Sequence, residues 1–197
     1  PKSLRYIAMS RDGDCFALFH PLVRRWFTAK HGEPTSVQRE AWPLIAGGGH
    51  VLASAPTGSG KTLAAFLWAL NGLVSGRVPP GGVRVLYISP LKALNNDIRH
   101  NLLVPLAELR RLALREGAAF PDIRVLTRSG DTPAGERGRM RRRPPEILIT
   151  TPESLNIILS ADSGPALFEG LRTVVLDEIH AVIGSKRGAH LMSAVER

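Results

Sequence analysis

Apolar residues recur at helical spacing in the first part of the chain. Between Phe19 and Lys30 they fall three or four positions apart, which predicts an amphipathic helix, and the segment 32–35 (Gly-Glu-Pro-Thr) ends it. A second, short helix is predicted around Gln38. The first 15 residues have no clear periodicity, and we expect them to be a vector remnant, a disordered lead-in or the end of an upstream segment, with no function assigned to them.

From residue 50 onwards, short apolar runs alternate with helical patterns. The expected strands are His50–Ser54, Val83–Ile88, Ile123–Thr127, Ile147–Thr150 and Thr173–Leu176. The expected helices are Lys61–Leu73, Leu91–Leu114, Pro133–Arg142 and Pro152–Leu159. This alternation predicts an α/β fold in which helices cover both faces of a parallel sheet and ligands bind at the carboxyl ends of the strands. Because the alternation continues beyond Gly76–Gly82, we expect that segment to be a loop within one domain.

Length and composition limit the possible classes of protein. The 197 residues suit one domain, expected at residues 16–197 after the lead-in. A formal net charge of +9 favours a polyanionic partner, although a solvated basic surface would give the same balance. Cys15 is a single cysteine and cannot form an internal disulfide, and the longest apolar run is far shorter than the roughly 20 residues that span a bilayer. We therefore expect a cytoplasmic protein that does not bind membranes.

Residues 55–62, Ala-Pro-Thr-Gly-Ser-Gly-Lys-Thr, have the pattern of a Walker A phosphate loop between an expected strand and an expected helix. Glycines let backbone N–H groups surround the β- and γ-phosphates, Lys61 supplies positive charge, and Thr62 supplies a hydroxyl ligand for Mg²⁺. Ala55 stands where many such loops have glycine. The residues expected to bind ATP in this loop are Pro56, Thr57, Gly58, Ser59, Gly60, Lys61 and Thr62.

An acidic pair follows the last expected strand. Asp177 is expected to hold Mg²⁺, and Glu178 to orient or deprotonate the attacking water. A strand that ends in Asp-Glu is weak evidence alone, but it becomes strong beside a Walker A loop more than a hundred residues earlier.

The run Asp177-Glu178-Ile179-His180 resembles the DExH box of superfamily 2 helicases, in which the histidine couples the nucleotide site to the nucleic-acid site. The resemblance implies that Gln38 contacts adenine, with Phe19 or Phe27 beside it. It also implies three turns that hold the sugar-phosphate backbone, SPLKAL, TRSG and TPES. The residues expected to bind nucleic acid there are Ser89, Pro90, Lys92, Thr127, Gly130, Thr151, Pro152 and Glu153.

Longer matches, among them SGDTPAGER and DEIHAVIGSKRGAHL, resemble the large helicase-related (Lhr) family. The resemblance covers about residues 16–197 and implies the first RecA-like domain of an ATP-dependent helicase or translocase that moves 3′ to 5′ on DNA or DNA:RNA. It further implies ATP and Mg²⁺ as cofactors, a second RecA-like domain, and a single-stranded or duplex nucleic-acid partner, for which DNA is favoured over RNA and RNA stays open. That domain's motifs are not found here, so we expect weak ATP binding and poor turnover from this chain alone.

Two other function classes stay open at this point. One is a P-loop ATPase outside the helicases, such as a transporter subunit or small-molecule kinase, and the other is a catalytically silent nucleic-acid-binding module. The arginine-rich segment Arg137–Arg143 is open in the same way, because it fits both a rim of the nucleic-acid track and a solvated helix face.

Overall fold

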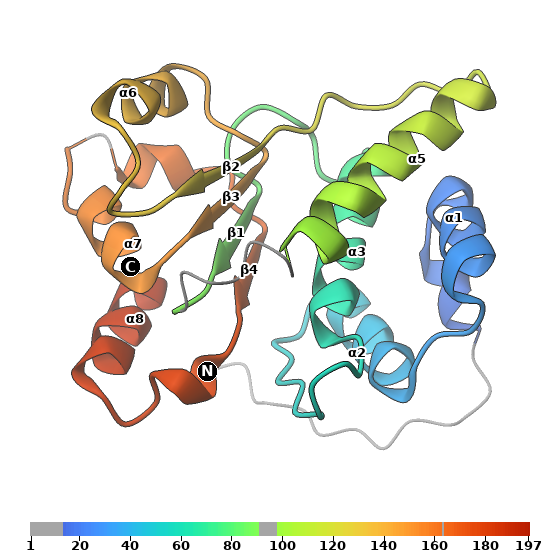
Figure 1. The fold of residues 1–197 in the computed structure, drawn as a ribbon, viewed down its shortest axis with the longest axis horizontal. Coiled ribbons are helices and arrows are strands. Elements are labelled where there is room, and N and C mark those ends of the chain that lie inside the picture. Colours follow the sequence, from blue (N-terminus) through green and yellow to red (C-terminus); the bar gives the residue numbers. More distant parts are fainter. Residues whose placement is uncertain (1–13, 91–97, 163) are drawn as a thin grey trace. The chain divides into compact units, whose positions relative to one another are not determined.

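The computed structural model describes residues 14–90, 98–162 and 164–197. These residues form two compact units (Figure 1). The first comprises the described residues before Gly76 together with Arg99–Phe120, and the second comprises those between Gly76 and Ile98 together with Pro121–Arg197. The loop that begins at Gly76 therefore starts where the second unit starts.

The first unit is helical. Its elements are the 3₁₀ helix η1 (Cys15–Leu18), α1 (Pro21–His31), α2 (Ser36–Ala46), α3 (Lys61–Val74), the π-helix η2 (Arg99–Leu103) and α5 (Val104–Arg115). The predicted first helix begins at Pro21 because the His20 side chain accepts a hydrogen bond from the Leu22 amide, and it ends at Gly32, whose φ is 70°. The part of the predicted long helix before residue 98 lies outside the described residues.

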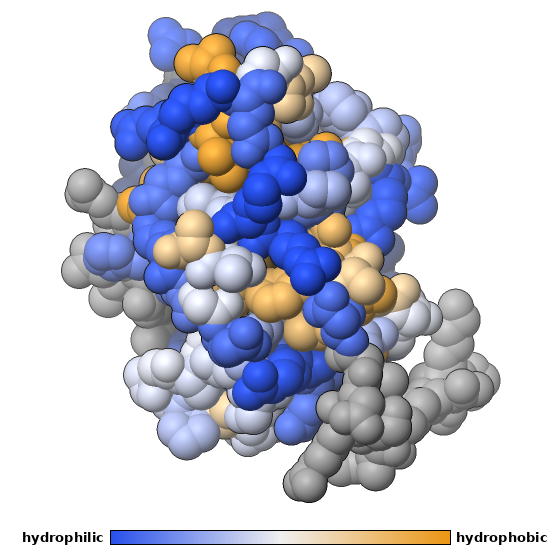
Figure 2. All heavy atoms as spheres, turned by 90° about the vertical axis from the view of Figure 1, so that its right-hand side faces the viewer, coloured by the Kyte–Doolittle hydropathy of each residue, from blue (hydrophilic) through white to orange (hydrophobic). Residues whose placement is uncertain are grey.

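Aromatic rings form the core of this unit. Phe19 packs edge to face on Trp42 at 4.6 Å between ring centroids, and Phe27 lies 5.6 Å from the same ring. Trp42 is fully buried, and its indole N–H donates to the Ala64 carbonyl at 3.1 Å, which joins α2 to α3. Figure 2 shows the face that carries α1 and α5, where hydrophobic residues lie in small groups among hydrophilic ones.

The predicted strand His50–Ser54 is wrong for this structure. Its residues form no strand, and the Leu52 side chain is 72% exposed. An apolar run becomes a strand only where a neighbouring strand completes its hydrogen bonds, and the strands that the described residues form all belong to the second unit.

The second unit is built on a parallel sheet. Its strands are β1 (Val85–Ile88), β2 (Val125–Arg128), β3 (Ile147–Thr150) and β4 (Thr173–Leu176), in the order β2-β3-β1-β4. Its helices are α6 (Ala134–Arg142), α7 (Pro152–Leu159) and α8 (Lys186–Glu196), with 3₁₀ turns η3 (Pro165–Phe168) and η4 (Ile179–Ala181). All four residues of both central strands are buried, as is typical of the inner strands of a parallel sheet.

Alternate residues of the sheet face the helices of this unit. Leu86, Ile88 and Leu148 form one buried cluster with side chains from all three helices, including Met140, Leu155 and Leu191. The strands β3 and β4 and the helix α7 have the predicted bounds, whereas β2 begins two residues later than predicted and α8 was not predicted. None of the helices among the described residues is long and apolar enough to cross a lipid bilayer.

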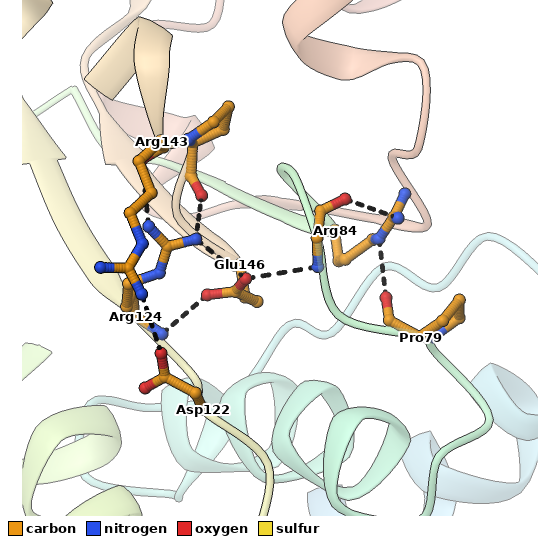
Figure 3. A network of polar contacts seen from close by, with 8 residues as sticks. Pro79, Arg84, Asp122, Arg124, Arg143 and Glu146 are labelled. Carbon is orange, nitrogen blue, oxygen red and sulfur yellow. Dashed lines mark hydrogen bonds and ion pairs between the residues drawn. The ribbon is translucent and has the colours of Figure 1, made fainter. Parts of the chain in front are cut away.

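A buried carboxylate joins the amino ends of three strands (Figure 3). Glu146, which precedes β3, accepts hydrogen bonds from the Arg124 amide at 2.9 Å and from the Arg124 guanidinium at 3.3 Å. The backbone oxygen of Glu146 also accepts hydrogen bonds from the amides of Arg84 and Val85, both at 3.0 Å. The Arg84 guanidinium in turn donates to the carbonyls of Pro79 and Gly170.

Candidate functional site

The predicted phosphate loop leads directly into α3, in the first unit. Gly58 and Gly60 have φ values of 81° and 87°, a backbone region that residues with side chains rarely adopt. Gly60 is the N-cap of α3 and has no side chain to occupy the first amides of the helix. Those amides and the positive end of the helix dipole suit an anion.

Polar groups of this loop also fit a polyphosphate. The Lys61 ammonium donates to the carbonyl oxygens of Ala55 and Pro56, the latter at 2.8 Å, so its charge lies over the loop. Within the described part of the chain, the buried Ser59 hydroxyl has no hydrogen-bond partner. A buried donor without a partner is unfavourable, and a phosphate oxygen would satisfy it.

Gln38 lies against this loop. Its side-chain oxygen accepts the Thr35 amide at 3.0 Å in a capping box, and its amide nitrogen donates to the Gly60 carbonyl at 3.3 Å. A Cβ at position 60 would lie 2.6 Å from that nitrogen, which is a second reason for glycine there. The structure thus brings together Gln38 and the phosphate loop, although the rings of Phe19 and Phe27 are used in the aromatic core rather than at the surface.

The acidic pair follows β4, in the second unit. The Asp177 carboxylate accepts hydrogen bonds from the Tyr87 hydroxyl and from the Glu178 amide, the second at 3.0 Å. Among the described residues, Glu178 alone combines a side chain with a positive φ, 49°. Its carboxylate lies 3.2 Å from His180 Nε2, so the predicted histidine contacts the predicted base. Backbone strain of this kind is typical of functional positions.

The register of the sheet aligns the ends of all four strands. Ile88 pairs with both Thr150 and Leu176, and Thr150 pairs with Arg128. The residues that come next in the chain therefore lie along one edge, and they belong to the SPLKAL, TPES, TRSG and DExH segments. The described residues of the three predicted turns and the acidic pair thus lie at the carboxyl edge of the sheet.

The turns themselves are shaped by hydroxyl groups. Thr151 is the N-cap of α7, where its hydroxyl accepts the Ser154 amide at 3.3 Å. In the TRSG turn, Thr132 accepts the Ser129 amide at 2.9 Å and leaves Thr127 and Gly130 exposed. Ser89 is buried, and its amide donates to the Thr150 carbonyl at 3.1 Å. Lys92 lies outside the described residues.

Two side chains at this edge were not predicted. Tyr87 is fully buried and bonds Asp177, and Arg187, in the first turn of α8, donates to Glu153 at 2.5 Å and to the Pro90 carbonyl at 3.1 Å. A tyrosine within an apolar strand signals that its hydroxyl needs a partner, but the sequence does not identify the partner. The pKa of the Glu153 carboxyl is lowered, chiefly by the hydrogen bond from Arg187.

Family comparison agrees with this arrangement. The family described as DEAD/DEAH box helicase matches residues 35–197. The chain is 49% identical to the Lhr helicase/probable uracil glycosylase of Mycolicibacterium smegmatis over 191 residues, which cover 96% of this chain and 13% of that protein. It is 44% identical to the ATP-dependent helicase Lhr-Core of Methanothermobacter thermautotrophicus, covering 96% of this chain and 22% of that protein. The chain thus spans a small part of these relatives.

Solved structures give the same result. The structure of Mycobacterium smegmatis helicase Lhr bound to ssDNA and AMP-PNP matches with a TM-score of 0.86 and 48% identity, over 93% of this chain and 23% of that one. A DEAD-box helicase, Mss116, matches with a TM-score of 0.68 at 21% identity and supports the fold alone. The predicted RecA-like α/β fold and the predicted resemblance to Lhr are confirmed, and a P-loop ATPase outside the helicases is set aside.

Proposed function

Because the chain belongs to the DEAD/DEAH box helicase family, we propose that it is the ATP-binding domain of a nucleic-acid helicase or translocase. The observation that carries the proposal is the shared edge of the sheet, where three turns suited to phosphate oxygens lie in one row with the strained Glu178. Residues 16–197 would form the first RecA-like domain, and a second such domain would complete the motor.

ATP would bind at the phosphate loop that leads into α3. The loop amides, Lys61 and the Ser59 hydroxyl would hold the phosphates, and Gln38 would reach the adenine edge.

Thr62 and Asp177 have the oxygen ligands that Mg²⁺ prefers, and we propose them as its protein ligands. Bound there, the ion would neutralise charge that develops on the phosphates. Glu178 would take a proton from the attacking water. His180, in contact with Glu178, would couple the nucleotide site to the nucleic-acid site.

The nucleic acid would lie across the turns at Ser89, Thr127 to Gly130, and Thr151. Hydroxyls and helix amides there bond phosphate oxygens without reading bases. As with the Lhr structure named above, we propose single-stranded DNA as one partner, and movement 3′ to 5′ in a protein with both motor domains. Arginines of a second motor domain raise turnover about 10³- to 10⁵-fold in related phosphoryl transfer, so we propose that rapid ATP hydrolysis requires both motor domains. We place the activity in the cytoplasm.

Binding of a fluorescent ATP analogue with Mg²⁺ tests the nucleotide site. We expect Lys61→Ala to weaken binding at least about tenfold, because a charge-assisted contact to phosphate contributes roughly 1.5–3 kcal/mol. Arg115→Ala is the matched control, since it removes one exposed positive charge from another helix of the same unit. Equal affinities of the Lys61 variant and the control would refute the assigned phosphate site. Binding that depends on Lys61 without any hydrolysis when both motor domains are present would identify a silent module instead.

A further inference from the structure

Arg187 joins two of the turns proposed to hold nucleic acid. Its Nε donates to the Glu153 carboxylate of the TPES turn, and its Nη2 donates to the Pro90 carbonyl of the SPLKAL turn. The distances are 2.5 and 3.1 Å. A nucleic-acid strand whose backbone contacts both turns must therefore pass close to this guanidinium.

Hydrogen bonds and one buried side chain anchor the segment between the DExH box and Arg187. The Ser185 hydroxyl donates to the Val182 carbonyl at 2.6 Å and accepts the Gly188 amide at 3.2 Å. Val182 is buried, and a side chain at Gly188 would collide with the Val182 carbonyl. Arg187 thus follows a short connection that is anchored at the buried Val182 and by the hydrogen bonds of Ser185.

Glu153 places a negative charge in a turn that is proposed to hold phosphates. A carboxylate in a turn that holds phosphates would repel them, and Glu153 is such a carboxylate. Its pairing with Arg187 removes that repulsion, so the pair presents no net negative charge to the strand. A guanidinium has five N–H donors, and the two printed bonds use only some of them. Among the described residues Nη1 has no partner, and the side chain is 48% exposed.

We propose that Arg187 is an additional contact to the nucleic-acid backbone, which donates to a phosphate from between the two turns while Glu153 and the Pro90 carbonyl hold its guanidinium in place. The inference rests on the proposed function, since it concerns the same strand. It adds to the three predicted turns a residue from beyond the DExH box, seven positions after His180, the last residue of that box.

Single-stranded DNA binding by this chain tests the proposal, with a labelled oligo-dT as the probe and anisotropy measured over a range of salt concentrations. We expect Arg187→Ala to weaken binding about tenfold and to flatten the slope of log K against log salt by about 0.7, the value for one lost phosphate contact on a single strand. Arg172→Ala is the control, because it removes an exposed arginine that precedes β4, at the opposite edge of the sheet. The control should keep the wild-type slope.

A second pair of variants separates contact from simple neutralisation. Glu153→Gln removes the carboxylate, and Arg187→Ala in that background should still weaken binding about tenfold if the guanidinium touches a phosphate. If the double variant binds as well as Glu153→Gln alone, Arg187 only neutralises Glu153 and the proposal is wrong. Arg187→Lys should keep the slope and lose part of the affinity, because an ammonium cannot reproduce the fork of a guanidinium.

The test also keeps the two proposals apart. If the wild-type chain shows no salt-dependent binding, the nucleic-acid track of the proposed function fails. If the wild type depends steeply on salt but Arg187→Ala matches Arg172→Ala, only the inference about Arg187 fails. Should Arg187→Ala lose its circular dichroism spectrum, Arg187→Gln replaces it, since glutamine can still donate to Glu153 and should show the same flattened slope.

Discussion

The two edges of the sheet in the second unit are built from the same strands, but they differ in how their carboxylates are buried and paired. At the amino edge, Glu146 is buried and its carboxylate is bonded by backbone amides and by Arg124. At the carboxyl edge, Glu178 sits in a strained conformation and Glu153 is half exposed beside Arg187. The hydrogen bonds of the first arrangement are made within the fold, whereas the charged side chains of the second are partly exposed to solvent.

The largest effect is expected from breaking the amino edge. Glu146→Ala would leave Arg124 without its buried partner and the Gly81 and Arg124 amides without acceptors, so we expect a loss of about 3 kcal/mol in the free energy of unfolding. Urea unfolding followed by circular dichroism measures it. Glu169→Ala, which removes an exposed carboxylate from the same unit, should change stability little.

The Glu146→Ala variant also tests whether the amino edge and the carboxyl edge of the sheet act independently. Under conditions in which Glu146→Ala is still folded, its affinity for single-stranded DNA should equal that of the wild type. A parallel loss of DNA affinity in the folded variant would mean that the two edges are not independent.

A smaller effect, with the opposite sign, is expected at the carboxyl edge. Glu178 has a left-handed backbone that glycine adopts without strain, so Glu178→Gly should be more stable than Glu178→Ala by about 1 kcal/mol, after allowing for the greater freedom of glycine in the unfolded chain. Both variants lack the carboxylate, and the comparison therefore isolates the backbone term. Both should also fail to hydrolyse ATP in a protein with two motor domains. Equal stability of the two variants would show that position 178 is not strained.

Local patterns were sufficient to predict much of the second unit. The bounds of β3 and α7 followed from an apolar run, a capping Thr151 and Pro152, all of which act within a few residues. The carboxyl edge was predictable for the same reason, because parallel strands must end together.

What the sequence did not reveal depends on partners distant in the chain. Arg187 and Glu153 are 34 residues apart, and Tyr87 and Asp177 are 90 apart, so no local pattern pairs them. The wrong strand at His50–Ser54 has the same origin, since its apolar residues fit a strand but the neighbour needed to pair with them is chosen by the fold.

The smallest effect concerns the pH dependence of the Glu153–Arg187 pair. The hydrogen bond from Arg187 lowers the pKa of Glu153 below its value in the unfolded chain. The pair therefore stabilises the fold at pH values above that unfolded pKa, and the contribution disappears as the pH falls through the lower folded pKa. Because solvent screens both side chains, we expect only about 0.5 kcal/mol. Urea unfolding of the wild type and Glu153→Gln should thus differ by this amount at pH 7 and converge in acid. A difference that persists well below the pKa would have to come from packing of the side chain instead of its charge.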